Sequence, residues 1–152
     1  MNGSCLCGAI LYQISAEPSG TTLCHCEDCR KSSGAPVVAW TFFPAGSIVF
    51  SGQTPRTFVF AGRERTFCPD CGSQLMFFDP ALPHQFEVTT CTLDRAAEMR
   101  PIDHNWMDDR LPWFETTDIL PRHPKNTPAP CGEIICDQAH DVAIVVNPDT
   151  GG

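Results

Sequence analysis

The sequence predicts an all-β domain whose sheets are held together by metal-binding loops. Short runs of β-branched and aromatic residues alternate with turn residues rich in Gly and Pro, a pattern typical of strands. Convincing helical periodicity is nearly absent. Most of the ten cysteines stand in close groups along the 152-residue chain. The length suits one domain that buries a hydrophobic core of its own.

The expected strands follow one another at short intervals and are separated by turns such as SGQTP and FAGRE. We expect strands over residues 9–14, 37–43, 47–50, 56–60, 64–67, 74–78 and 86–93. EDCRKSS (27–33) and DRAAEM (94–99) are each one or two helical turns at most, too short to organise a core. The proline-rich stretch 121–130 marks the end of the main unit and a linker. Beyond it, EIIC and VAIVV form either a hairpin or a poorly ordered tail.

Charge and sequence ends restrict the partners and the compartment. The formal net charge of -8 disfavours binding to nucleic acid or to an anionic membrane. No apolar run is long enough to span a bilayer. The start, MNGSCLCG, lacks the design of a secretory signal, so we expect a cytoplasmic protein with reduced thiols. Cysteines in that compartment indicate metal binding or catalysis, whereas a disulfide framework is the alternative for a secreted chain.

Four cysteines predict a closed structural zinc site. Cys5 and Cys7 form a C-x-C pair, and Cys68 and Cys71 belong to a C-x-x-C-G turn of the kind common in zinc knuckles. The glycine allows the tight reversal of the chain around the metal. Four thiolates complete a tetrahedral site, which would tie the N-terminal strand to the middle of the chain.

A second group, Cys24, Cys26 and Cys29, lies in the short segment LCHCEDCRKSSG. Three thiolates can bind one face of a zinc ion and leave the fourth position free, which is the arrangement of a catalytic zinc. The alternative is a second closed site, with His104, Cys91 or His25 as the fourth ligand. Two zincs per chain, one structural and one catalytic, are therefore expected.

The order of these motifs resembles the glutathione-dependent formaldehyde-activating enzyme family, which includes centromere protein V. The resemblance rests on GSCLCGAI, CHCEDCRKSSGAP, VAW, FCPDCGS and HNWMDDRLPW. It covers about residues 3–123, so it implies a family-type zinc-binding domain over 1–123 and an extension over 124–152. It also implies a β-tent fold of antiparallel sheets, two zincs, the same division of the cysteines, and carbon–sulfur lyase or S-(hydroxymethyl)glutathione synthase chemistry.

Other residues are candidates for handling the substrate. His104 is expected to act as a general acid or base or to hydrogen-bond a ligand, and Arg110 to bind a carboxylate. Arg30 and Lys31 follow the last cysteine and either neutralise the thiolates or are ordinary solvated charges. Trp40, Trp106 and Trp113 are expected in the core rather than in a pocket wall.

Two features depart from the family pattern, and one further motif stays outside the ligand set. Cys91 stands where related sequences more often carry a small residue, and the 124–152 extension lies outside the resemblance. Cys131, Cys136 and His140 form a C-x₄-C-x₃-H series that is only a weak indication of a third metal site.

The predicted function is a zinc-dependent lyase or synthase that makes or breaks a thiol adduct of an aldehyde or other electrophile. By resemblance, the thiol is glutathione. The alternative is a non-catalytic zinc module that binds a protein or nucleic-acid partner, although the acidic balance weighs against nucleic acid.

Overall fold

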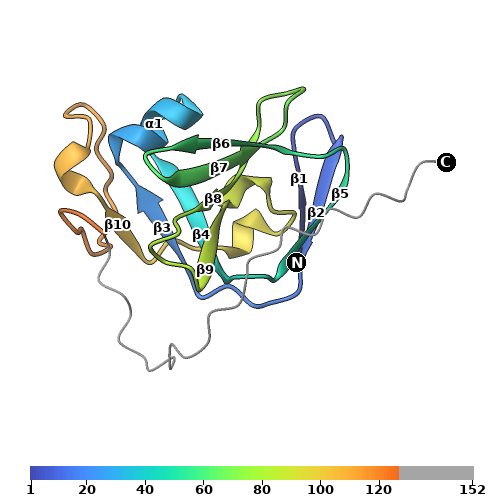
Figure 1. Ribbon diagram of the computed structural model, residues 1–152. Helices are drawn as coiled ribbons and strands as arrows, with labels where there is room; N and C mark the ends of the chain where they lie inside the picture. The colour runs from blue at the N-terminus through green and yellow to red at the C-terminus, as the bar shows by residue number, and fades with distance from the viewer. Residues whose placement is uncertain (127–152) are drawn as a thin grey trace.

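The computed structural model describes residues 1–126 (Figure 1). The EIIC and VAIVV segments and the series Cys131, Cys136 and His140 lie outside the described residues. Within residues 1–126, no helix is long and apolar enough to cross a membrane. The boundary expected at residue 123 stays a prediction.

Two β-sheets form the described part of the chain, so the all-β prediction is confirmed. The larger sheet has seven strands in the spatial order β10-β3-β4-β9-β8-β7-β6, and the smaller has the order β1-β2-β5. Neighbouring strands are antiparallel, except that β10 runs parallel to β3. The strands are β1 (Asn2–Ser4), β2 (Ile10–Ile14), β3 (Gly20–Cys24), β4 (Val38–Pro44), β5 (Ile48–Gly52), β6 (Arg56–Phe60), β7 (Arg63–Phe67), β8 (Gln74–Phe78), β9 (Gln85–Thr89) and β10 (Asp103–Asn105).

All seven expected strands are present, with ends shifted by a few residues at most. The expected strand over 86–93 ends earlier, because Thr90–Thr92 forms a 3₁₀ turn. The sequence analysis missed β1, β3 and β10. β1 and β10 have three residues each, too few to show an alternating pattern. EDCRKSS forms the single α-helix of residues 1–126, α1 (Glu27–Ser33), and half of DRAAEM forms a short 3₁₀ helix, Ala96–Glu98.

The main core lies between the two sheets. It is built from alternate residues of β2, β5, β4, β8 and β9, including Tyr12, Phe43, Phe50 and Val88. Figure 1 shows the smaller sheet on one side of the molecule, with α1 and β10 at the opposite side. Cys5 and Cys68 are themselves members of this core. The four-cysteine group is therefore expected to contribute directly to the packing of one sheet against the other.

The opposite face of β4 carries a second, smaller apolar cluster. Trp40 is buried there with Val38, Cys24 and Cys29, and Phe77 and Trp106 pack against them. Residues two apart on a strand share a face, so Trp40 and Phe43 point to opposite sides of the sheet. This division places the four-cysteine group with the main core and the three-cysteine group with the smaller cluster.

Candidate metal centres and active site

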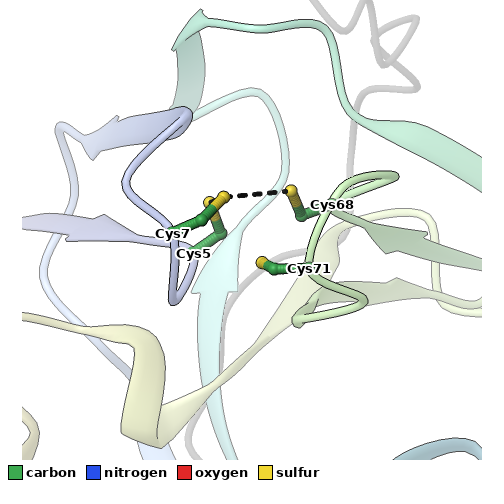
Figure 2. Close-up of side chains that lie close together, drawn as sticks. All are labelled: Cys5, Cys7, Cys68 and Cys71. Carbon is green, nitrogen blue, oxygen red and sulfur yellow. Dashed lines mark hydrogen bonds between the residues drawn. The ribbon is translucent and has the colours of Figure 1, made fainter.

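The first candidate metal centre brings together Cys5, Cys7, Cys68 and Cys71. Figure 2 shows the four side chains directed toward one another from two separate loops. Their sulfur atoms all lie within 4.8 Å of one another. Cys7 Sγ is 3.4 Å from Cys5 Sγ and 3.8 Å from Cys68 Sγ. The grouping predicted from the spacing is therefore present in the fold.

Local backbone geometry explains why each loop presents its sulfurs inward. The N–H of Gly72 donates to the Cys68 carbonyl at 2.9 Å, and Gly72 has a φ of 73°, a left-handed conformation that favours glycine. The first loop turns at Gly8, which has a φ of 76° and whose N–H donates to the Cys5 carbonyl at 3.1 Å. The backbone N–H of Ile10 donates to Cys5 Sγ at 3.3 Å.

The donor atoms fit a tetrahedral zinc. A Zn–S bond of about 2.3 Å implies sulfur atoms about 3.8 Å apart. This is close to the separations of Cys7 Sγ from Cys5 Sγ and Cys68 Sγ, which are 3.4 and 3.8 Å. All four cysteines are free thiols rather than disulfides. The Ser73 hydroxyl lies 3.2 Å from Cys71 Sγ, and this hydrogen bond lowers the pKa of the Cys71 thiol to about 5. A thiol that ionises readily is suited to bind a metal.

The second candidate metal centre contains Cys24, Cys26 and Cys29, whose sulfur atoms also lie within 4.8 Å of one another. Cys24 ends β3, Cys26 precedes α1, and Cys29 lies in the first turn of that helix. Cys26 Sγ caps the helix by accepting a hydrogen bond from the Cys29 N–H at 3.2 Å. The junction of strand and helix thus folds the three thiols together.

Among residues 1–126, no fourth histidine, cysteine or carboxylate joins the three-cysteine group. Cys91 is exposed and belongs to neither group. The neighbouring thiols of Cys24 and Cys26 lower the pKa of Cys29, and the nearby Arg65 guanidinium lowers it further. Arg65 Nη2 lies 3.7 Å from Cys29 Sγ. A tetrahedral metal ion bound by this group alone would therefore have one coordination position left for an external ligand.

A cavity of about 290 Å³ adjoins the three-cysteine group. Its lining includes all three cysteines, together with twelve further residues that are mostly charged, amide or aromatic. These are Glu27, Asp28, Arg63, Arg65, Phe77, Asp79, Leu82, Glu87, Asn105, Trp106, Asp109 and Asn126. The four-cysteine group lines no part of this cavity. The two groups therefore differ in access as well as in the number of sulfurs.

Strand register aligns three of the lining residues. Phe77 on β8 is directly opposite Arg65 on β7 and Glu87 on β9, so the three side chains share one face of the sheet. The Arg65 guanidinium lies over the Phe77 ring, 4.7 Å from its centroid. Burial raises the pKa of the Glu87 carboxyl to about 8, and the Cys29 thiolate contributes to the increase. Arg65 and Glu87 thus flank an aromatic surface beside Cys29.

His104 lies in a buried chain of polar groups rather than in the cavity lining. Its Nδ1 is 2.8 Å from His25 Nε2, and its Nε2 is 3.1 Å from both carboxylate oxygens of Asp118. Both imidazole rings are fully buried. A carboxylate only accepts, so His104 Nε2 donates to Asp118, and in a neutral ring Nδ1 then accepts from His25. Burial, together with His104, lowers the pKa of His25 to about 4.

The other predicted substrate-handling residues make contacts within the protein. Arg110 donates to the Phe114 carbonyl, and Lys31 forms an ion pair with Glu27 at 2.7 Å. Arg30 donates to the carbonyls of His25 at 3.1 Å and Asp109 at 3.0 Å. None of these three cations lines the cavity. Their predicted roles stay predictions.

The tryptophan predictions have mixed outcomes. Trp40 is in the core, with 1% of its surface exposed, as expected. For Trp113 the prediction is wrong, because 71% of its surface is exposed. Trp106 is also not a core residue, because it lines the cavity at the end of β10.

Sequence reasoning missed Arg65, Glu87 and Asn105 as residues of the site. Glu87 gave a usable signal, since a charged residue alternates with apolar ones in the expected strand FEVTT. Arg65 stands among polar residues in its strand, and Asn105 belongs to a strand that was not predicted. Only the strand register brings these residues to the three-cysteine group.

Comparison with known proteins finds two curated relatives. A curated Halomonas elongata protein named "Putative glutathione-dependent formaldehyde-activating enzyme" is 28% identical over 125 residues, covering 76% of this chain and 80% of that protein. A Schizosaccharomyces pombe protein named as an uncharacterized lyase is 32% identical over 75 residues, covering 49% of this chain and 55% of that protein.

A crystal structure of a Rhodobacter sphaeroides protein matches with a TM-score of 0.54. The two chains are 18% identical, and the match covers 62% of this chain and 89% of the other, which supports the fold alone. The model of the family described as glutathione-dependent formaldehyde-activating enzyme matches residues 1–109. The chain therefore belongs to the glutathione-dependent formaldehyde-activating enzyme family.

Proposed function

We propose that this protein is a zinc-dependent carbon–sulfur lyase or synthase that breaks or makes a glutathione adduct of an aldehyde. The observation that carries the proposal is the contrast between the two cysteine groups. Four sulfurs form one group, of which Cys5 and Cys68 lie in the main core and Cys7 is exposed, whereas the three sulfurs of the other group line a cavity. The family described for residues 1–109 supports glutathione and formaldehyde as the reactants.

In this proposal, each cysteine group holds one zinc. Cys5, Cys7, Cys68 and Cys71 hold a structural ion, and Cys24, Cys26 and Cys29 hold an ion open to the cavity. Zinc bound there would supply the Lewis acidity that keeps a substrate sulfur in its thiolate form. The synthase direction forms a bond between that sulfur and the carbonyl carbon, the C=O π bond breaks, and the proton given up by the thiol is added to the carbonyl oxygen. The lyase direction reverses these changes.

Arg65 has the most direct electrostatic role in this proposal. Three thiolates and one divalent ion leave a net negative charge, which an adjacent cation would partly offset. Arg65 provides such a cation, because its Nη2 lies 3.7 Å from Cys29 Sγ. The sequence analysis named Arg30 and Lys31 as candidates for this role, with ordinary solvated charges as the alternative. In our proposal Arg30 instead holds the loop through the His25 carbonyl, and Lys31 stays paired with Glu27.

We assign His104 a positioning role. Its ring is buried between His25 and Asp118, and His25 lies between two of the cysteines in the sequence. The His25 N–H also donates to the Asn105 carbonyl at 3.1 Å. Through these contacts β10 can fix the strand end that presents Cys24 and Cys26. Arg110 would support the same region through its bond to the Phe114 carbonyl.

Zinc analysis combined with an adduct assay tests the proposal. We expect two zincs per chain by elemental analysis, one of which exchanges readily with a chromogenic chelator. Glutathione and ¹³C-formaldehyde should equilibrate with their hydroxymethyl adduct faster in the presence of the zinc-loaded protein, measured by NMR exchange spectroscopy. Two inert zincs and no acceleration would favour the non-catalytic binding module instead. Reduced thiols throughout residues 1–126 are consistent with the cytoplasm, which we keep as the proposed compartment.

A further inference from the structure

Two residues that line the cavity beside the three-cysteine group each have one side-chain polar atom without a hydrogen-bond partner within residues 1–126. These atoms are the guanidinium nitrogen Arg65 Nη1 and the amide oxygen Asn105 Oδ1, and both atoms are buried. Asn105 as a whole exposes only 8% of its surface. A buried donor or acceptor without a partner is costly, so such groups in a cavity indicate a ligand that completes them.

The fold holds both residues firmly next to the candidate metal ligands. Asn105 is the register partner of Cys24 in the parallel pair of β10 and β3. Arg65 contacts Cys29 Sγ through Nη2 and stacks on Phe77, which fixes the plane of the guanidinium. One residue therefore approaches the cysteine group from β10 and the other from β7.

The two atoms differ in hydrogen-bonding chemistry. Arg65 Nη1 can only donate, and Asn105 Oδ1 can only accept. An aldehyde carbonyl offers acceptors alone, and a thioether offers only a weak one. A hydroxyl group both donates and accepts, so it can satisfy the two atoms together. Among the species of the proposed reaction, the S-hydroxyalkyl adduct carries such a hydroxyl on the carbon bonded to sulfur.

We propose that Arg65 and Asn105 are substrate-binding residues that select S-hydroxyalkyl thiol adducts through the adduct hydroxyl. Arg65 Nη1 donates to the hydroxyl oxygen, and the hydroxyl donates to Asn105 Oδ1. This inference rests on the proposed function, because it requires a thiol adduct to reach the three-cysteine group.

Stable thioethers can test the inference by binding alone, without any turnover. S-(2-hydroxyethyl)glutathione and S-propylglutathione differ by the replacement of a hydroxyl with a methyl group of similar size. Isothermal titration calorimetry on the zinc-loaded protein should show at least roughly 10-fold tighter binding of the hydroxyl compound, the usual effect of one good hydrogen bond. This comparison needs no variant, so it is independent of any effect on folding.

Variants then assign the preference to the two residues. Arg65→Lys keeps the positive charge beside Cys29 but loses the forked donor pair, and Asn105→Leu removes the acceptor at similar volume. Each should reduce the preference for the hydroxyl compound to near unity while leaving the zinc content at two. If both residues bind one hydroxyl, the double variant should lose little more than either single variant. Arg56→Gln, which changes an exposed arginine on neighbouring β6, is the charge control and should retain the preference.

The possible outcomes separate this inference from the proposed function. Equal binding of the two thioethers by the wild-type protein would overturn the inference and leave the proposed function intact. A preference that persists in both variants would overturn the assignment of these residues. Binding of neither thioether would contradict glutathione as the thiol, and the inference would fall with it.

Discussion

Replacing Cys68 with Ser should prevent stable folding of the whole domain. Cys68 is completely buried, belongs to the main core, and lies 3.8 Å from Cys7 in the four-cysteine group. Binding of a structural zinc contributes on the order of 10 kcal/mol to folding. The total free energy of unfolding of a domain is about 5–15 kcal/mol, so the contribution lost with the zinc is comparable with the entire stability of the domain. Even a third of it, about 3 kcal/mol, would lower the Tm by about 10 °C.

Thermal melts by circular dichroism, together with zinc analysis of the soluble fraction, measure the effect. Cys91→Ser is the matched control, because it makes the same chemical change at an exposed cysteine outside both groups. We expect the control to melt like the wild type and to keep its zinc. A soluble Cys68→Ser protein with the wild-type Tm would refute the assignment of a structural zinc to this group.

The remaining predictions concern the chain end, the open site and the pH dependence of stability. A chain ending at Asn126 should retain both zincs by elemental analysis, because all seven proposed ligands precede it; loss of one equivalent would place a ligand in the extension. Cys26→Ser should lose one zinc and the adduct chemistry but keep its Tm, since Ser also caps helices well; a mild chelator should likewise remove one zinc first from the wild type. Glu87 has a raised folded-state pKa of about 8, so its ionisation on going from pH 5.5 to 8 costs stability. The free energy of unfolding of Glu87→Gln, measured with urea, should therefore rise by about 2 kcal/mol relative to that of the wild type between pH 5.5 and pH 8, after a discount for the partial exposure of Glu87. A difference between the two proteins that stays the same at both pH values would contradict this.

Local patterns were sufficient to predict most strands and both cysteine groups. The motifs containing Cys68 and Cys71 or Cys24, Cys26 and Cys29 are short, and their turns depend on neighbouring residues only. The cavity wall could not be predicted in this way, because Arg65, Glu87 and Asn105 come together through the pairing of strands distant in the sequence. The contacts of His104 likewise come from two directions: the parallel pairing of β10 with β3 brings it to His25, and the segment that follows β10 brings Asp118 to it.

The different sequence separations in the two cysteine groups set an order for metal loading during synthesis. The four-cysteine group joins Cys7 to Cys68 across 61 positions, whereas the other group lies within one strand end and the first turn of a helix. Closing the long loop costs about 2 kcal/mol more than closing one a tenth as long. On the proposed assignment, a nascent chain can bind its first zinc at Cys24, Cys26 and Cys29 soon after these residues leave the ribosome. The second zinc can bind only after Cys71 has been synthesised and the two sheets have packed together, so its binding would mark a late stage of folding.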